Sequence, residues 1–163
     1  MDNQQYFLSI DNGTQSVRAM IFDAQGQLIA KSKFDIEPYF SDQPGWAEQH
    51  AEYFWDALCK ACQALWPLLP IPKESIAAVS VTTQRATAIA MGADNQPLRP
   101  AISWLDQRQV ETKPALGALE SALFTLVRAK PLVDLMHKQA EANWIAQNEP
   151  NIWDKVHKFV LLS

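Results

Sequence analysis

The hydrophobic pattern of the first 34 residues constrains the fold most strongly. Apolar residues alternate with other residues from Tyr6 to Ile10 and again from Val17 to Ile21, which is the period of a β-strand. The sequence DAQGQ at 23–27 is typical of a hairpin turn in which a glycine takes a left-handed conformation. With a third strand over 28–34, the pattern predicts a three-stranded antiparallel meander.

A long amphipathic helix is predicted after this meander. Beyond a loop over 37–50, apolar residues recur at helical spacing until Pro67 and Pro70 end the pattern. We expect the helix to pack against the meander, which is the nearest sheet. The predicted inner stripe comprises Ala51, Phe54, Trp55, Leu58, Cys59, Cys62, Leu65 and Trp66.

The run SIAAVSVTT at 75–83 is apolar and β-branched, which predicts a strand buried on both faces. We expect this strand to join the sheet beside the first strand, with the helix as the crossover. Shorter strands are expected over 86–91 and 101–104. The predicted class is therefore α/β with a mixed sheet.

Helical spacing dominates the remainder. The leucines of 116–127 predict one helix, stopped by Pro131, and a second helix is predicted from Leu135 to just before Pro150. The chain then closes on an apolar run. Because a free terminus is usually polar, we expect the chain to be a fragment of a longer protein.

Composition and charge exclude several classes of function. The 163 residues carry a formal charge of −4, and the charges are scattered, which argues against a nucleic-acid or anionic-membrane partner. We find no signal peptide and no stretch of the roughly 18 apolar residues that would span a bilayer. The sequence therefore predicts a cytoplasmic protein.

The sequence CKAC at 59–62 has the C-x-x-C spacing of redox and metal sites. Reactive pairs favour a helix N-terminus, whereas this pair lies two turns inside the predicted helix. We therefore interpret Cys59 and Cys62 as packing residues of the inner face.

The stretch DNGTQSVR at 11–18 places a carboxylate, a glycine turn, hydroxyls and a guanidinium within eight positions. Asn-Gly is common in plain hairpins, and that interpretation stays open. The alternative is a phosphate cradle, in which Gly13 lets the backbone approach the ligand, Thr14 donates and Arg18 neutralises charge. Asp11 would then help to hold Mg²⁺ through water.

Three further stretches suit a polyhydroxylated ligand. TTQRAT at 82–87 follows the predicted buried strand, where open α/β sheets bind ligands. PAISWLDQR at 100–108 offers an aromatic face and a carboxylate, while PGWAEQ at 44–49 offers another tryptophan. The structural alternatives are a loop arginine, a buried Trp104 with Asp106 as a helix cap, and Trp46 as a hydrophobic staple.

Taken together, these four stretches resemble the FGGY carbohydrate kinases in order and spacing, over essentially the whole chain. The resemblance implies the ribonuclease-H-like fold shared with actin and Hsp70 chaperones. It implies that residues 1–163 are the front part of the first of two such domains, with MgATP bound between them. The implied reaction is ATP-dependent phosphorylation of a sugar or polyol, with no nucleic-acid or membrane partner; homo-oligomer formation stays open.

The resemblance also implies roles for individual residues. Asp11 would be a catalytic carboxylate near the transferred phosphate and Mg²⁺, and it would hold the metal through water. The phosphate-binding turn would comprise Gly13, Thr14, Gln15 and Arg18. The sugar pocket would be lined by Trp46, Gln84, Arg85, Trp104 and Asp106. The family's proton-accepting aspartate would follow residue 163, so the isolated chain is expected to be inactive.

Two departures bear on the substrate. Glycerol kinases have a glutamate directly after the arginine of TTQRAT, and here Ala86 stands there, so glycerol is not expected. Xylulokinases have Met-His in place of Arg85-Ala86, which argues against xylulose. A non-catalytic sugar-binding or regulatory module on the same scaffold is the alternative function.

Overall fold

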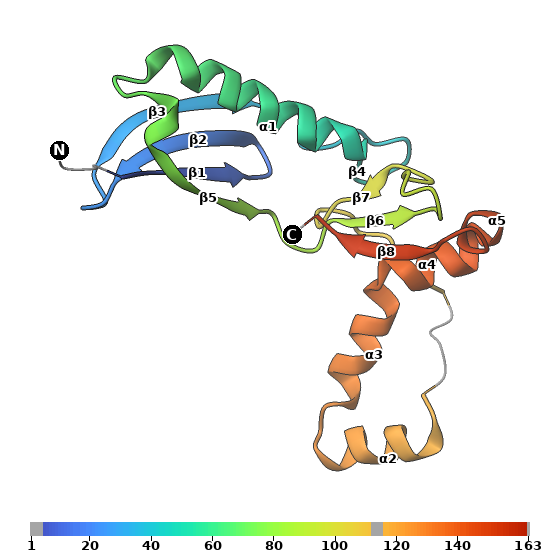
Figure 1. Cartoon of the computed structure of the whole chain (residues 1–163). Coiled ribbons are helices and arrows are strands. Elements are labelled where there is room, and N and C mark those ends of the chain that lie inside the picture. Colours follow the sequence, from blue (N-terminus) through green and yellow to red (C-terminus); the bar gives the residue numbers. More distant parts are fainter. Residues whose placement is uncertain (1–4, 112–115, 163) are drawn as a thin grey trace. The chain divides into compact units, whose positions relative to one another are not determined.

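The structure, a computed structural model, describes residues 5–111 and 116–162. The chain divides into two compact units (Figure 1). The first unit comprises residues 1–40, 49–87 and 161–163, and the second comprises residues 41–48 and 88–160. No helix in the described part of the chain is long and apolar enough to cross a bilayer.

The first unit contains the predicted meander, helix and fourth strand. Its elements are β1 (Tyr6–Asn12), β2 (Ser16–Asp23), β3 (Leu28–Asp35), α1 (Ala51–Leu65), the short 3-10 helices η1 (Trp66–Leu68) and η2 (Lys73–Ser75), and β5 (Ile76–Thr83). The sheet order is β3-β2-β1-β5. β1 pairs antiparallel with β2 and parallel with β5, which confirms the predicted crossover.

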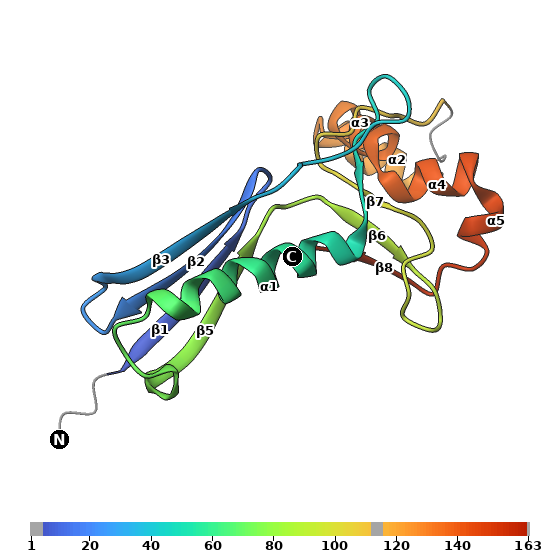
Figure 2. The same cartoon turned by 90° about the horizontal axis from the view of Figure 1, so that it is seen from above.

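The core of the first unit lies between this sheet and α1, which runs along one face of the sheet (Figure 2). The alternation predicted for β2 is confirmed, since Val17, Ala19 and Ile21 are fully buried. β3 is joined to the helix by a hydrogen bond from Ser32 Oγ to the Ala61 carbonyl, at 2.6 Å. Gly26 has a φ of 79°, as the predicted hairpin turn requires.

The second unit has a smaller sheet, ordered β4-β7-β6-β8, and four helices among its described residues. Its core includes Ala90, Ile102 and Val110 together with Trp144 and Ile145 of one helix. The elements are β4 (Glu48–Gln49), β6 (Ala88–Met91), β7 (Ala101–Ile102), α2 (Ala118–Leu126), α3 (Lys130–Gln139), α4 (Glu141–Asn148), α5 (Pro150–Trp153) and β8 (Lys158–Leu161).

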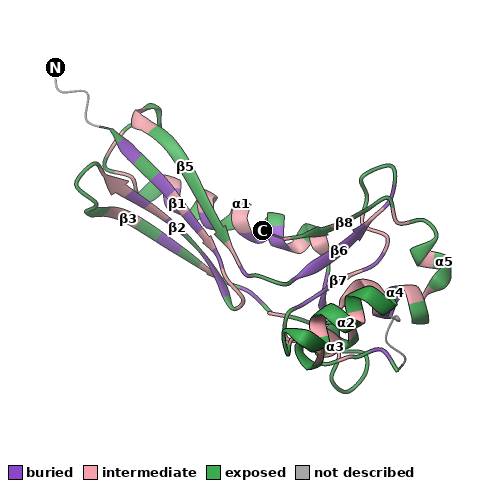
Figure 3. Cartoon of the chain, turned by 90° about the horizontal axis from the view of Figure 1, so that it is seen from below, coloured by how far each residue is buried: buried purple, intermediate pink, exposed green. Residues whose placement is uncertain are grey.

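The prediction that 75–83 is buried on both faces is wrong within this chain. β5 is the edge strand of its sheet, and Figure 3 shows it exposed along most of its length. Val79 and Val81 are 59% and 50% exposed. The run is apolar as predicted, but α1 packs mainly on β2 and β3, and among the described residues of the first unit no helix covers β5.

The predicted helix boundaries also need correction. Pro131 does not stop a helix but stands in the first turn of α3, where its missing N–H is not required. The helix predicted from Leu135 onward is broken at Ala140, whose backbone is extended, so Trp144 belongs to α4. In α1 the buried residues are Phe54, Ala57, Ala61 and Leu65, whereas Trp55 of the predicted stripe is 66% exposed.

Candidate functional site

Asp11 lies near the carboxyl end of β1, directly opposite Arg18 of β2. The Arg18 guanidinium approaches the Asp11 carboxylate to 2.8 Å, and the side chains remain 49% and 38% exposed. The Thr82 hydroxyl of β5 lies 3.4 Å from the other Asp11 oxygen. The predicted acid and guanidinium are therefore brought together, partly exposed, at the carboxyl end of β1.

The turn between β1 and β2 is closed by its own backbone. The Gly13 N–H donates to the Ser16 carbonyl at 3.1 Å. A Cβ on Gly13 would lie 3.2 Å from that same carbonyl oxygen, so a side chain there would crowd the turn. The Gln15 carbonyl accepts from the Ile36 N–H at 3.0 Å, which fixes the turn to the residue after β3. Backbone hydrogen bonds therefore fix the conformation of the turn, and no side chain covers its backbone at Gly13.

The carboxyl end of β5 lies beside this turn, because β1 and β5 run parallel. An open hollow of about 550 Å³ is lined there by Val81, Thr82, Thr83, Arg85, Leu161 and Leu162. The Gln84 N–H donates to the Asn12 carbonyl at 3.0 Å, which ties the two strand ends together. In open α/β sheets ligands bind at this position, beyond the carboxyl ends of the strands.

Several polar atoms at these strand ends are buried without a hydrogen-bond partner. They are Asn12 Oδ1, Thr83 Oγ1, Gln84 Oε1 and Thr87 Oγ1. Such atoms are rare in folded proteins and are usually satisfied by water or a ligand. Gln84 was predicted. Asn12, Thr83 and Thr87 lie within the stretches 11–18 and 82–87 but were not named, because the sequence does not show that their polar atoms are buried.

Ala86, which follows Arg85, has a φ of 55°. A left-handed conformation is strained for a residue with a side chain, and such strain clusters at binding sites. Arg85 itself is exposed. Ala86 is also the residue at which the resemblance implied a departure from glycerol kinases.

The second unit carries Trp46, Trp104 and Asp106. Trp104 is 51% exposed, so the interpretation as a buried tryptophan is wrong. Trp46 packs edge-to-face on Trp144, with ring centres 5.3 Å apart, and not as a staple on α1. No described helix begins at Asp106; its carboxylate accepts from the Arg108 N–H two residues on, at 2.8 Å.

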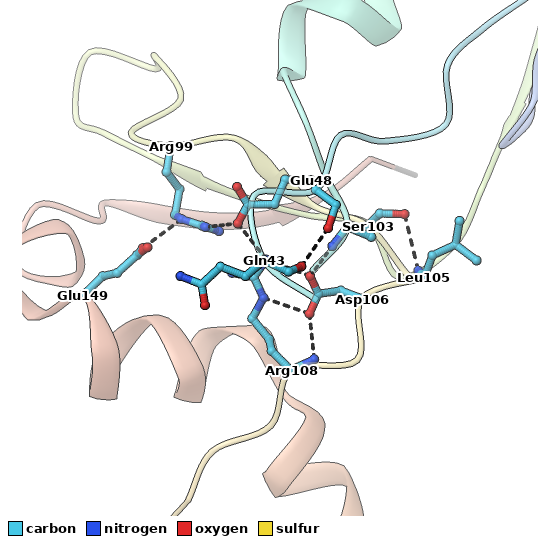
Figure 4. A network of polar contacts seen from close by, with 10 residues as sticks. Gln43, Glu48, Arg99, Ser103, Leu105, Asp106, Arg108 and Glu149 are labelled. Carbon is cyan, nitrogen blue, oxygen red and sulfur yellow. Dashed lines mark hydrogen bonds and ion pairs between the residues drawn. The ribbon is translucent and has the colours of Figure 1, made fainter. Parts of the chain in front are cut away.

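Asp106 belongs to a buried network of charged side chains (Figure 4). Its Oδ2 also accepts from the Ala47 N–H, at 2.7 Å. Arg108 Nη2 lies 2.7 Å from Glu48, and Glu48 pairs in turn with Arg99. Burial lowers the pKa of Arg108, but hydrogen bonds and charge from Asp106 and Glu48 outweigh this effect and raise that pKa above its ordinary value. Glu48 and Arg99 were not predicted as members of this network, because their partners are distant in the chain.

The cysteines are free thiols on α1, and both are partly buried. Cys62 packs against the core of the first unit. Its pKa is raised by burial and, to a smaller extent, by Cys59. A raised pKa makes a thiol less reactive, which supports the interpretation as packing residues. Within residues 5–111 and 116–162, no cluster of three or more His, Cys, Asp or Glu could hold a metal ion.

Comparison with known proteins agrees with these motifs. A family model, the FGGY family of carbohydrate kinases, N-terminal domain, matches residues 6–163. A glycerol kinase from Thermococcus gammatolerans is 29% identical over 157 residues, covering 95% of this chain and 31% of that protein. The chain thus spans about a third of the length of such relatives.

Solved structures share the fold. A xyloylose kinase from Brucella ovis matches 96% of this chain and 32% of its own, with a TM-score of 0.75 and 23% identity. The Plasmodium falciparum glycerol kinase with ADP matches 98% of this chain and 32% of its own, with a TM-score of 0.65 and 21% identity. These likenesses confirm the predicted ribonuclease-H-like fold with its mixed sheet.

Proposed function

Because this chain belongs to the FGGY family of carbohydrate kinases, we propose that the whole protein transfers a phosphoryl group from ATP to a hydroxyl of a sugar or polyol. We propose further that residues 1–163 are the front part of its first ribonuclease-H-like domain. The length of the relatives supports this, and so does the open edge of β5, which a complete sheet would cover. The isolated chain is expected to be inactive.

One observation carries the proposal: the first unit gathers an exposed acid, a glycine turn and an arginine at the carboxyl ends of β1 and β5. These groups fit a magnesium-bound nucleotide. Mg²⁺ prefers carboxylates and water, which Asp11 can supply, and Arg18 can pair with phosphate oxygens. A bare backbone at Gly13 permits close approach. When bound, MgATP supplies the phosphoryl group.

The chain's own residues would act by positioning. Thr14, Gln15 and Arg18 would hold phosphate oxygens, and Asp11 would orient the metal through water. Positioning and charge stabilisation supply most of the catalysis in phosphoryl transfer. The relative from Plasmodium falciparum was solved with ADP, which supports a nucleotide as the second substrate. Because ATP is an intracellular substrate, we place the enzyme in the cytoplasm.

Sugar contacts are proposed in both units. The Gln84 amide of the first unit can donate to and accept from hydroxyls, and Arg85 can donate to them. Trp104 of the second unit offers an exposed aromatic face. Trp46, also of the second unit, is partly exposed. Asp106, whose oxygens already accept four internal hydrogen bonds, supports this set from within. At Ala86 a methyl group replaces a hydrogen-bond acceptor, so we propose a substrate other than glycerol.

The test is Asp11→Ala in the full-length enzyme, assayed with ATP and a panel of ketoses and polyols. We expect kcat to fall by orders of magnitude while the KM for the sugar stays similar. The matched control is Asp35→Asn, an exposed acid at the end of β3 in the same sheet. Near-normal turnover of Asp11→Ala would remove the proposed mechanism, and sugar binding without ATP binding in calorimetry would favour a non-catalytic module.

A further inference from the structure

The second unit buries a group of charges that the proposed reaction does not use. The side chains of Glu48, Arg99, Asp106 and Arg108 are each only 3–6% exposed. Burying ion pairs is expensive, and apolar residues of similar volume often stabilise a protein equally well. Stability alone therefore does not explain a buried network of this kind. The best-attested role of such networks is to fix one local conformation.

Arg108 is the centre of this network. Its backbone N–H, Nε and Nη2 all donate to Asp106, at 2.8, 2.8 and 2.7 Å. Its guanidinium also lies 3.9 Å from the ring centre of Trp46 and 4.5 Å from that of Trp144. Only a planar group with several donors can stack on rings and hold two carboxylates at once, so lysine is not equivalent here.

The hydrogen bonds from Arg108 hold the Asp106 carboxylate, and Asp106 is part of the turn over 103–106. The Asp106 N–H donates to the Ser103 carbonyl at 2.9 Å, which closes the turn. The turn is bound to the neighbouring segment in two places: Ala47 N–H to Asp106 Oδ2 at 2.7 Å, and Ser103 N–H to the Ala47 carbonyl at 2.9 Å. Trp104 projects from this turn with half of its surface exposed.

We propose that Arg108 is a positioning residue for sugar binding, which acts through Asp106 to hold the Trp104 turn and through stacking to hold Trp46. This inference rests on the proposed function. Arg108 and Asp106 do not touch the sugar; they hold an aromatic face in place, so that little conformational freedom is lost when the sugar binds.

The test is Arg108→Lys in the full-length enzyme, with the KM for the sugar and for ATP measured separately. We expect the sugar KM to rise about tenfold, as loss of one aromatic contact would cause. The KM for ATP should stay within about twofold. The matched control is Arg99→Lys, because Arg99 is as buried and pairs with Glu48 and Glu149 but does not contact Asp106. Both variants should lower the melting temperature, and only Arg108→Lys should raise the sugar KM.

A double-mutant cycle with Trp104→Ala distinguishes an effect of Arg108 transmitted through Trp104 from a non-specific destabilisation of the second unit. If Arg108 acts through Trp104, Arg108→Lys should change the sugar KM by less than about twofold in the Trp104→Ala background. Independent, multiplying effects would overturn the proposal, and so would equal sugar KM values for the two lysine variants. Asp106→Asn, which keeps the shape but removes acceptor capacity, replaces Arg108→Lys if that variant does not fold. If the unmodified enzyme phosphorylates no sugar or polyol, the proposed function itself fails. If that enzyme is active but Arg108→Lys leaves its sugar KM unchanged, only the role of Arg108 fails.

Discussion

Glu48 offers the sharpest test of how the second unit is held together. Its carboxylate is almost completely buried and accepts from two arginines, Arg99 and Arg108. Removing one partner of a buried ion pair costs about 3–5 kcal/mol, because the other charge is left without compensation. Both guanidiniums approach Glu48 Oε1, and the amide oxygen of Glu48→Gln can still accept from them but carries no charge. We therefore expect a loss of about 2–4 kcal/mol in the free energy of unfolding.

The measurement is equilibrium unfolding of the full-length protein in urea, followed by tryptophan fluorescence and circular dichroism. Trp46 and Trp144 lie against Arg108, so the fluorescence reports on this unit. The control is Asp35→Asn, which removes an ion pair with Lys33 at 2.5 Å whose side chains are 55% and 76% exposed. An exposed pair contributes about 0–1 kcal/mol. Equal losses for the two variants would refute the reasoning that burial sets the cost.

Three further predictions follow from burial. Ile21→Ala, in the fully buried centre of β2, should lower the free energy of unfolding by about 2–5 kcal/mol, measured by urea titration, because it leaves a cavity. Burial and, to a smaller extent, the charge of Asp106 raise the pKa of Glu141, so its ionised form is disfavoured in the folded state. Glu141→Gln should therefore raise the melting temperature at pH 7, and this gain should disappear as the pH falls through the raised pKa toward 4.5 and both states become protonated. Alkylation of Cys62 should show a pH midpoint above 9.0, and Cys59→Ala should lower that midpoint.

Much of the first unit was predictable because its signals are local. Ile21 is buried because it alternates with neighbours in its own strand, and Leu65 is buried because it recurs at helical spacing. The error at Val79 has the opposite cause. Its apolar, β-branched run favours a strand, but exposure depends on which other segments lie over the sheet, and the run itself holds no information about them.

Asp106 shows the same limit within the candidate site. The sequence predicted that Trp104 and Asp106 both belong to the site. The role of Asp106 depends on hydrogen-bond partners that sequence spacing does not show. One of them, the Ala47 N–H, lies 59 positions away in the chain and donates to Asp106 Oδ2. A carboxylate with four internal donors has little capacity left for a ligand, whereas the neighbouring Trp104 keeps an exposed face. A motif therefore identifies the residues of a site more reliably than it divides them into those that touch the substrate and those that hold the others in place.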